Sequence, residues 1–400
     1  MANTIKVTDK LAAIAIDVFM AKSYVAANSV RSDEDEFGGS TKIGDTLRKR
    51  VPARYQLQTG NDRSNPQAIE QQTKTLSLNQ NKFVALNLTA QELAVFTGTD
   101  AKAQRELIEQ PVANLARYVD SYCFGLMALQ AANQISIATA GTVSYKDIAN
   151  MSAQMGTQLA PSERILAASP LDLASIQGSM STLLNPTKAV SDAFDSGLAG
   201  SGLGFGSWHE SVSVGTQGCL TVSGTASATV TAEGTITIPT AATILQGQAF
   251  TIAGVYKIDP QTLTGIPSLY TFVAAAASTG TSVQITNPIY TIAGSITLAN
   301  VSALPISGAV LTNVGVAGDS GKNAYNLIGW TKKAFSLACM DLPTDLPGAE
   351  ASKVTDNGIS IRVTRQAQTR ANAVDTICDL QFGALVLRPE WIARMTGVAA

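Results

Sequence analysis

His209 is the only histidine in the sequence, and histidine is the side chain most often used to move protons near neutral pH. A hydrolase triad would also need a nucleophile next to it, and the sequence has no Gly-x-Ser-x-Gly turn to present one. We therefore expect His209 to lie in a loop or at an interface and to take no part in catalysis.

Glycines cluster shortly before this histidine, at Gly200, Gly202, Gly204 and Gly206. Such a cluster can cradle a phosphate, but this spacing fits neither Gly-x-Gly-x-x-Gly nor the P-loop. No Lys-Ser or Lys-Thr pair follows, and no helix start follows either. The pattern favours a mobile loop over a nucleotide site.

The sequence gives no evidence for a metal site or for redox chemistry either. The acidic run Asp33–Glu36 lacks the alternate spacing and the glycine of a calcium loop, so it is interpreted as a solvated acidic face. The cysteines are far apart, which predicts buried free thiols of an intracellular protein and neither disulfides nor a zinc site. We expect no catalytic, metal or cofactor residues, and no enzyme; the four cysteines are Cys123, Cys219, Cys339 and Cys378.

Composition points away from charged partners. The net charge is -2, which gives no electrostatic drive toward nucleic acid or an anionic membrane. No apolar run reaches 18 residues, and Met1–Asp17 is predicted to be an amphipathic helix and not a signal peptide. Only 14% of residues are charged, against about 25% in typical domains. Either other chains cover much of the surface, or Ser, Thr, Asn and Gln supply its polarity.

The most regular pattern is a helical stripe within residues 100–134, whose apolar residues recur in steps of four and three. At about 1.5 Å per residue, this predicts a rod of roughly 50 Å. A short coiled-coil seam is the alternative. Pro111 either kinks the rod or is the first residue of a helix over 111–133. The stripe consists of Ile108, Val112, Leu115, Val119, Tyr122, Leu126 and Leu129.

Before this rod, residues 1–30 are predicted to form one helix. Residues 42–86 alternate weakly around the polar turn 61–66, which predicts a long charged hairpin without a core of its own. A two-stranded ribbon is marginally stable in water, so something else should cover it. Thr89 and Glu92 have the spacing of a capping box.

After the rod, the sequence becomes mixed. We predict a helix over 146–159, a strand over 164–169 and a helix over 170–184 that begins at Ser169-Pro170. Further strands are predicted over 359–365 and 377–387.

From Gln261 to Gly318 there is no charged residue. Short alternating runs with turn signals every 8–12 residues or so predict a small all-β domain over 216–325. The predicted runs are 219–223, 229–231, 235–238, 248–253, 269–273, 282–286 and 295–298.

Five stretches carry a family resemblance through their order along the chain: Gly44–Arg54, Arg164–Asp172, Phe250–Gly254, Asn326–Trp330 and Arg388–Glu390. With the order of the predicted elements, they resemble the major capsid proteins of tailed phages, which have the HK97-like fold. The sequence is most similar to the coat proteins of short-tailed phages of the Salmonella-infecting type, which carry an inserted β-barrel domain.

The resemblance implies an α+β fold made of five parts. It also implies an icosahedral shell of pentamers and hexamers that encloses double-stranded DNA without sequence-specific binding. Scaffolding protein, portal and a decoration protein are the implied partners, with no membrane, and assembly is implied in the bacterial host cytoplasm. The parts are an N-terminal arm (1–41), an E-loop hairpin (42–86), a spine helix and peripheral domain (87–135 with 386–400), an axial domain (136–215 and 326–385) and an inserted all-β barrel or immunoglobulin-like domain (216–325).

Two sets of residues are expected at subunit contacts. The charges of the hairpin would contact a neighbouring subunit, and the glycine-rich segment would form the tip of the axial domain at the capsomer centre. The first set is Arg48, Lys49, Arg50, Arg54, Asp62, Arg63, Glu70 and Lys74; the second is Gly200, Gly202, Phe205, Trp208 and His209.

One departure from the family concerns Ala232–Thr235, which is shorter than the loop that reaches a neighbouring capsomer in similar coats. Whether this chain makes the contact with a neighbouring capsomer is not predicted, and no lysine is assigned to covalent crosslinking. The alternative function is a surface or adhesive structural protein with an immunoglobulin-like module. The Thr- and Ser-rich β stretch favours it, and the absence of a signal-peptide pattern counts against it.

Overall fold

The computed structural model describes residues 7–29, 46–51, 55, 72–89, 91–92, 101–137, 142–180, 202–218, 222–314, 323–368 and 371–399. The chain forms two compact units, each built from separated segments. The first unit combines Met1–Arg48, Thr75–Cys123 and Phe335–Leu385; the second combines Lys49–Lys74, Phe124–Ala334 and Val386–Ala400.

The predicted rod is helix α5, Ala101–Gln130, which continues through Pro111. The interpretation of Pro111 as the first residue of a helix is therefore wrong. The first half of the stripe faces the chain's own core, which favours an amphipathic helix over a coiled-coil seam; its buried residues are Ile108, Val112, Leu115 and Val119.

The last turns of α5 bury a different set of positions. Tyr122, Leu126 and Leu129 of the predicted stripe are only half-buried. Phe124 is buried instead and meets the Trp330 ring edge-on, with 5.7 Å between ring centroids. The covered side changes because residues from Phe124 onward belong to the second unit.

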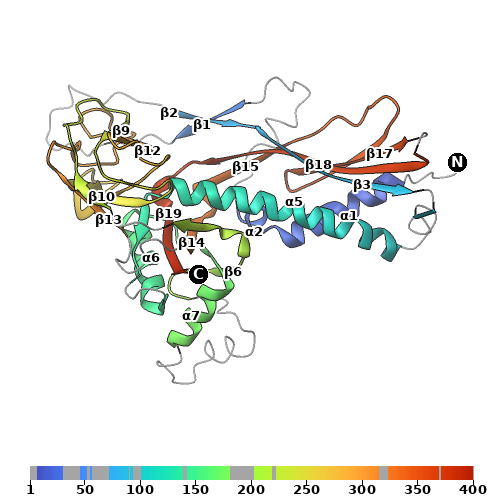
Figure 1. Cartoon of the computed structure of the whole chain (residues 1–400), viewed down its shortest axis with the longest axis horizontal. Coiled ribbons are helices and arrows are strands. Elements are labelled where there is room, and N and C mark those ends of the chain that lie inside the picture. Colours follow the sequence, from blue (N-terminus) through green and yellow to red (C-terminus); the bar gives the residue numbers. More distant parts are fainter. Residues whose placement is uncertain are drawn as a thin grey trace, which may run out of the picture. The chain divides into compact units, whose positions relative to one another are not determined.

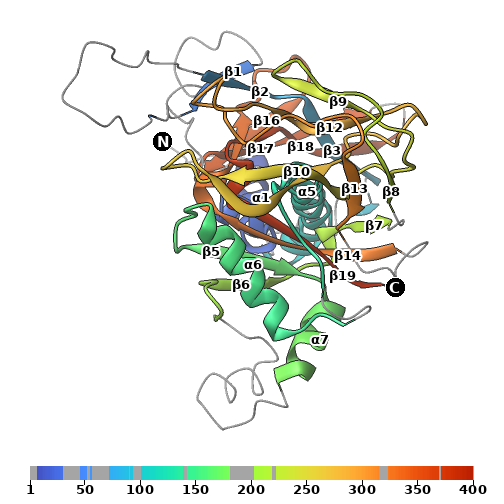
Figure 2. The ribbon, with the colours of Figure 1, turned by 90° about the vertical axis from the view of Figure 1, so that its left-hand side faces the viewer.

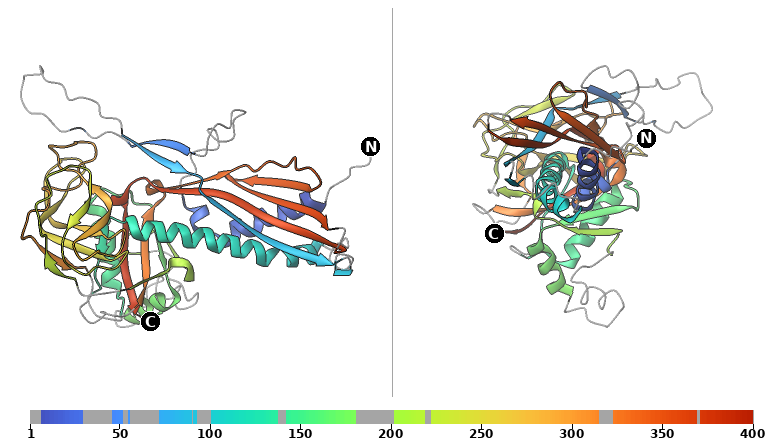
Figure 3. Two further views of the ribbon diagram at one scale, coloured as in Figure 1. Left: turned by 45° about the horizontal axis from the view of Figure 1, so that its top comes forward. Right: turned by 90° about the vertical axis from the view of Figure 1, so that its right-hand side faces the viewer.

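The first unit is a five-stranded sheet with two helices on one face (Figure 3). The strands run in the order β15-β18-β17-β16, and β3 pairs with β18. Helix α1 (Val7–Lys22) packs on β16 and β17, and Tyr118 and Tyr122 of α5 contact Phe382 of β18 edge-on. The strands are β3 (Gln80–Thr89), β15 (Phe335–Met340), β16 (Glu350–Asp356), β17 (Ile359–Gln368) and β18 (Ala373–Val386).

The N-terminal helix is shorter than predicted and is interrupted. Helix α1 ends at Lys22, and a second short helix, α2 (Tyr24–Ala27), starts after Ser23. The break occurs because Ser23 has extended backbone and uses its hydroxyl to cap α2, accepting from the Ala26 N–H at 3.2 Å.

The predicted hairpin is also shorter. Strands β1 (Thr46–Val51) and β2 (Gln72–Ser77) form a two-stranded sheet, which we call the ribbon. Residues 80–89 leave it and pair with β18 as β3. The ribbon base does have a small core, contrary to expectation, in which Leu76 and Leu78 are buried with Ala338. Gly383 permits this approach, since a Cβ there would collide with the Ser77 carbonyl oxygen.

The second unit contains a six-stranded sheet in the order β4-β19-β14-β5-β6, with β7 on β14. Helices α6 (Tyr145–Thr157) and α7 (Pro170–Met180) contact each other and β19 (Figure 2). Strand pairs β5–β6 and β19–β4 are parallel. The strands are β4 (Asn133–Ile135), β5 (Arg164–Ala168), β6 (Ser207–Glu210), β7 (Thr216–Gly218), β14 (Asn323–Thr331) and β19 (Ile392–Ala399), with short 3-10 turns at Val212–Val214, Lys332–Ala334 and Pro389–Trp391.

Side-chain caps stand at the start of α6, where none was predicted, and at the start of α7, where Ser169-Pro170 predicted one. The Ser144 hydroxyl donates to the Asp147 carboxylate at 2.6 Å before α6, and Ser169 does the same to Asp172 before α7. The Thr89 N–H and hydroxyl both donate to Glu92 at 2.9 Å, as the spacing predicted.

The inserted domain is all-β, with the sheets β11-β10-β13-β8 and β12-β9 (Figure 1). Strands β7 and β14 pair where the chain enters and leaves it. Residues 229–231 and 295–298 are not strands, and β13 was missed because Val310–Asn313 is short and half exposed. The strands are β8 (Ser223–Thr225), β9 (Thr235–Pro239), β10 (Ala249–Ile258), β11 (Gly265–Val273), β12 (Ser282–Ile289) and β13 (Val310–Asn313).

Strand pairing differs from the expected grouping of the flanking parts. Residues 335–385 were grouped with 136–215, but β18 pairs with β3 and so lies in the first unit. Residues 386–400 were grouped with the long helix, but β19 pairs with β14 in the second unit. Strand pairing between distant parts of the chain determines which unit each of these two segments joins. Hydrophobic periodicity does not predict that pairing.

Candidate assembly sites

The ribbon presents two arginines on one face. Burial alternates along β1, so that Arg48 and Arg50 are exposed while Leu47 and Lys49 are half-buried. Leu47 packs against the small core at the ribbon base. One face of β1 is thus anchored, and the other holds two guanidinium groups in a fixed register.

Lys74 of β2 is held differently. Its ammonium donates to the carbonyl oxygens of Val386, at 3.2 Å, and Leu387, at 3.0 Å. Burial lowers the pKa of Lys74 below its ordinary value. The side chain is therefore engaged within its own chain. The other expected ribbon contacts, Arg54, Asp62, Arg63 and Glu70, lie outside the described residues, and the interface role of the whole set stays a prediction.

The described part of the glycine-rich segment is a turn that leads into a strand. Gly202 and Phe205 form an isolated β-bridge across the turn, and residues 207–210 are strand β6. The mobility of the loop around these glycines stays a prediction. Phe205 is buried in the core of the sheet, where Gly329 leaves room for its ring. A Cβ on Gly329 would lie 2.9 Å from the Phe205 Cε1 atom.

Trp208 is also buried, and His209 is half-buried on β6. Burial lowers the pKa of His209 below its ordinary value. Phe205 and Trp208 therefore stabilise this segment from inside and are not exposed contact residues. Gly200 lies outside the described residues, and the placement of the segment at a capsomer centre remains a prediction.

The inserted domain caps the C-terminus of α5. The last carbonyl groups of a helix have no partner within it. The Thr286 hydroxyl is within hydrogen-bond distance of two carbonyl oxygens, that of Leu129 at 2.8 Å and that of Val273 at 2.9 Å, and its one proton can go to either. The Asn287 amide donates to the Gln130 carbonyl oxygen at 3.0 Å. Two side chains of β12 thus contact the helix end and fix the domain against it.

A buried arginine makes a second connection. Arg394 of β19 is 1% exposed, and its Nη2 donates to the Gly247 carbonyl oxygen at 2.6 Å. Its Nε donates to the Gln134 Oε1 atom at 2.6 Å. These bonds join the inserted domain to two strands of the six-stranded sheet.

In the first unit, Asp120 joins α5 to the N-terminal helices. Its carboxylate accepts from the Ser23 hydroxyl at 2.6 Å and from the N–H groups of Tyr24, at 3.0 Å, and Val25, at 3.2 Å. Burial raises the pKa of Asp120 from 3.8 to about 6, although these bonds act in the opposite direction.

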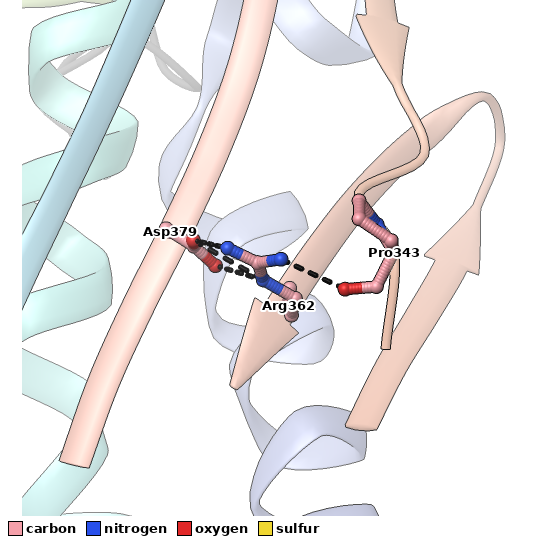
Figure 4. A network of polar contacts seen from close by, with 3 residues as sticks. All are labelled: Pro343, Arg362 and Asp379. Atoms are coloured by element: carbon pink, nitrogen blue, oxygen red, sulfur yellow. Dashed lines mark hydrogen bonds and ion pairs between the residues drawn. The ribbon is translucent and has the colours of Figure 1, made fainter. Parts of the chain in front are cut away.

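Arg362 of β17 and Asp379 of β18 form an ion pair on directly opposed positions (Figure 4). The Arg362 Nε donates to Asp379 at 3.0 Å, and its Nη1 donates to the Pro343 carbonyl oxygen at 2.8 Å. A second guanidinium nitrogen, Nη2, also bonds the carboxylate. The pair fixes the loop after β15 to the sheet.

Sequence reasoning missed Asp120, Lys257, Thr286 and Asn287. Lys257 had a usable signal, because it is the only charged residue between Glu233 and Asp259 in a domain with few charges. A lone charge at the end of an apolar strand indicates a specific buried partner.

The described residues contain no group of three or more His, Cys, Asp or Glu side chains that could hold a metal ion. Cys123, Cys339 and Cys378 form no disulfide. None of the described helices combines the length and apolarity that a membrane-spanning helix needs.

The family model for "P22 coat protein - gene protein 5" matches residues 3–397. No curated protein matches the chain. Similar solved structures include the capsid of Cyanophage P-SCSP1u, with 11% identity over 93% of this chain and 86% of that chain and a TM-score of 0.45. Another, from Mycobacterium phage Che8, has 10% identity over 92% and 90% and a TM-score of 0.44.

The CUS-3 coat protein I-domain has 25% identity over 24% of this chain and 96% of that chain, with a TM-score of 0.19. The family assignment rests on the family model, which spans nearly the whole chain. The chain belongs to the P22 coat protein family and is a tailed-phage major capsid protein with an HK97-like fold, a structural protein that forms the shell of the virion.

Proposed function

We propose that the chain enters the shell as pentamers and hexamers, and that the ribbon clamps each subunit to a neighbour. The observation that supports the clamp is the pair of exposed arginines on β1, Arg48 and Arg50. They share one face of a two-stranded sheet, which gains little stability by itself. Carboxylates on a neighbouring subunit would both neutralise this face and cover the ribbon.

Each exposed ion pair contributes only about 0.2–1 kcal/mol. Every subunit of a closed shell repeats the contact, so that a small term per subunit decides whether the shell forms. Salt screens such pairs, because the Debye length falls from about 10 Å at 0.1 M to about 3 Å at 1 M. Assembly through this face should therefore depend on ionic strength.

The remaining partners follow from the family. We propose that assembly takes place in the bacterial host cytoplasm on a scaffolding protein, with a portal at one vertex, and that a decoration protein adds to the finished shell. Packaged double-stranded DNA is enclosed without sequence-specific binding, in keeping with a net charge of -2. The inserted domain has its own core and acts as a module anchored to α5.

The test reverses both charges, Arg48→Glu with Arg50→Glu. The matched control is Lys332→Glu with Lys333→Glu, which changes the net charge equally at two exposed positions outside the ribbon. Shell formation is followed by light scattering and electron microscopy at low and high salt, and the unassembled subunit is melted in parallel.

We expect the ribbon variant to keep its melting temperature and to assemble slowly or not at all, while the control assembles as the unaltered chain does. The clamp is refuted if the ribbon variant assembles normally at both salt concentrations, or if its subunit unfolds at a clearly lower temperature.

A further inference from the structure

A cavity of about 130 Å³, with a largely apolar lining that carries a few polar and charged side chains, lies within the second unit. Its walls come from both the inserted domain and the six-stranded sheet with its connections. Taking about 30 Å³ per water molecule, it has room for roughly four waters or for one small ion with some water. The lining residues that matter here are Lys74, Asn133, Gln158, Lys257, Tyr270 and Glu390.

Lys257 brings a buried positive charge to this cavity. The residue is 5% exposed, and its ammonium donates to the Asn133 Oδ1 atom at 2.7 Å and to the Gln154 Oε1 atom at 3.4 Å. The orientation of Asn133 is fixed, because its Nδ2 donates to the Glu390 carbonyl oxygen at 2.8 Å. Both partners of Lys257 are therefore neutral amide oxygens.

An ammonium group has three N–H donors, so Lys257 has one donor to spare and no carboxylate within ion-pair distance among the described residues. Burial without a counter-charge lowers the pKa of Lys257 to about 8. A buried charge in a protein is normally paired. The Lys257 ammonium therefore lacks an anionic partner.

Gln158 supplies an independent observation. It caps the end of α6, is 6% exposed and lines the same cavity. Its Nε2 group donates to no acceptor among the described residues. A buried amide donor without a partner costs about 1–3 kcal/mol, so this site also requires an acceptor.

Two other charges face the cavity. Lys74 adds a second ammonium, already bound to two carbonyl oxygens. Glu390 is the one carboxylate in the lining, and it pairs with Arg388 at 3.5 Å. The Glu390 charge also acts on Lys74 and partly offsets it, so Lys257 is the ammonium group of the lining without a counter-charge, and this favours an anionic occupant.

We propose that this cavity binds one phosphate-sized inorganic oxyanion, held by the Lys257 ammonium and the Gln158 amide. Such an ion accepts several hydrogen bonds at once and supplies the counter-charge that Lys257 lacks. Because the inserted domain and the sheet share the cavity, the bound ion stabilises their contact. This inference does not depend on how subunits meet in a shell.

The test uses the unassembled full-length chain. Thermal unfolding is followed by tryptophan fluorescence, since Trp208, Trp330 and Trp391 all belong to the second unit. Sodium sulfate is titrated at constant ionic strength against sodium chloride. A ligand that binds only the folded chain raises the melting temperature along a binding curve. Sulfate also stabilises proteins generally, by exclusion from their surface, and that effect does not saturate.

Lys257→Gln removes the charge, and Lys332→Gln is the control at an exposed position. We expect the unaltered chain and the control to show a saturable rise, with Lys257→Gln showing only the general effect. Sulfate keeps its charge between pH 7 and pH 9, so the saturable part should weaken over this range as Lys257 loses its proton. Equal responses in all three proteins would refute the site.

A direct measurement covers the case in which Lys257→Gln does not fold. Equilibrium dialysis of the unaltered chain with radiolabelled inorganic phosphate should give one bound ion per chain, displaced by sulfate and not by chloride. Absence of bound phosphate at low millimolar concentration would overturn the proposal whatever the variant does.

Discussion

The junction between the N-terminal helices and α5 should weaken as the pH rises, because it depends on Asp120. This carboxyl group is buried and accepts three hydrogen bonds from residues 23–25. Its raised pKa means that the folded chain binds a proton more tightly than the unfolded chain does. The resulting stabilisation is complete below the unfolded pKa and is lost as the pH rises through about 6.

The size of the effect follows from the two pKa values. A folded pKa of about 6 against 3.8 corresponds to about 3 kcal/mol over the whole range. Between pH 7.5 and pH 5.0 only part of this stabilisation is gained. Proton linkage at one group makes the free energy of unfolding about 1.4 kcal/mol larger at pH 5.0 than at pH 7.5. Asn has no such titration, so Asp120→Asn should remove this increment.

The assay is urea unfolding of the unassembled subunit at pH 7.5 and pH 5.0. Circular dichroism at 222 nm is the suitable signal, because α1 and most of α5 belong to the first unit while every tryptophan belongs to the second. Other groups can also make the stability depend on pH, so the quantity of interest is the difference in pH response between variants. Asp17→Asn, an exposed carboxyl of α1, is the matched control.

We expect the unaltered chain and Asp17→Asn to respond to pH alike, and Asp120→Asn to respond less by about 1.4 kcal/mol. The absolute stability of Asp120→Asn is not diagnostic, since its amide group places a donor beside the N–H donors of α2. An unchanged pH response in Asp120→Asn would show that this carboxyl is not the one whose protonation stabilises the junction.

Two further predictions concern the inserted domain and nucleic acid. A fragment of residues 216–325 should fold alone as a monomeric all-β unit because its core is internal, and collapsed amide dispersion in its NMR spectrum would contradict this. The unassembled subunit should bind duplex DNA no more tightly than a generic acidic protein, since it releases few counterions; sub-micromolar, salt-sensitive binding in fluorescence anisotropy would contradict that.

Elements with strong local signals were predictable from the sequence. The first half of the α5 stripe, the start of α7 at Ser169-Pro170, and the strands predicted over 235–238, 248–253, 269–273 and 282–286 match the structure, because periodicity and capping depend on nearby residues. Strand partners were not predictable in this way. The pairing of β3 with β18 joins residues nearly 300 positions apart, and no local pattern in either strand specifies it.

The candidate sites likewise differ in whether local sequence patterns or distant contacts determine the environment of each residue. The exposure of Arg48 and Arg50 follows from simple alternation along a strand. Phe205 and Trp208 were assigned to the axial tip by the family resemblance, yet both are buried, and Gly329 on a distant strand leaves room for the Phe205 ring in the core. The contacts of Lys257 could not be predicted from the sequence, because its partners Asn133 and Gln154 are distant along the chain and become its neighbours only in the fold.

The most direct test of the account is a cryo-electron microscopy map of the assembled shell at side-chain resolution. If the ribbon is the intersubunit clamp, Arg48 and Arg50 of each ribbon lie within about 4 Å of carboxylates on a neighbouring subunit. A shell in which both guanidinium groups face solvent in every subunit would contradict the proposal that the ribbon is the intersubunit clamp.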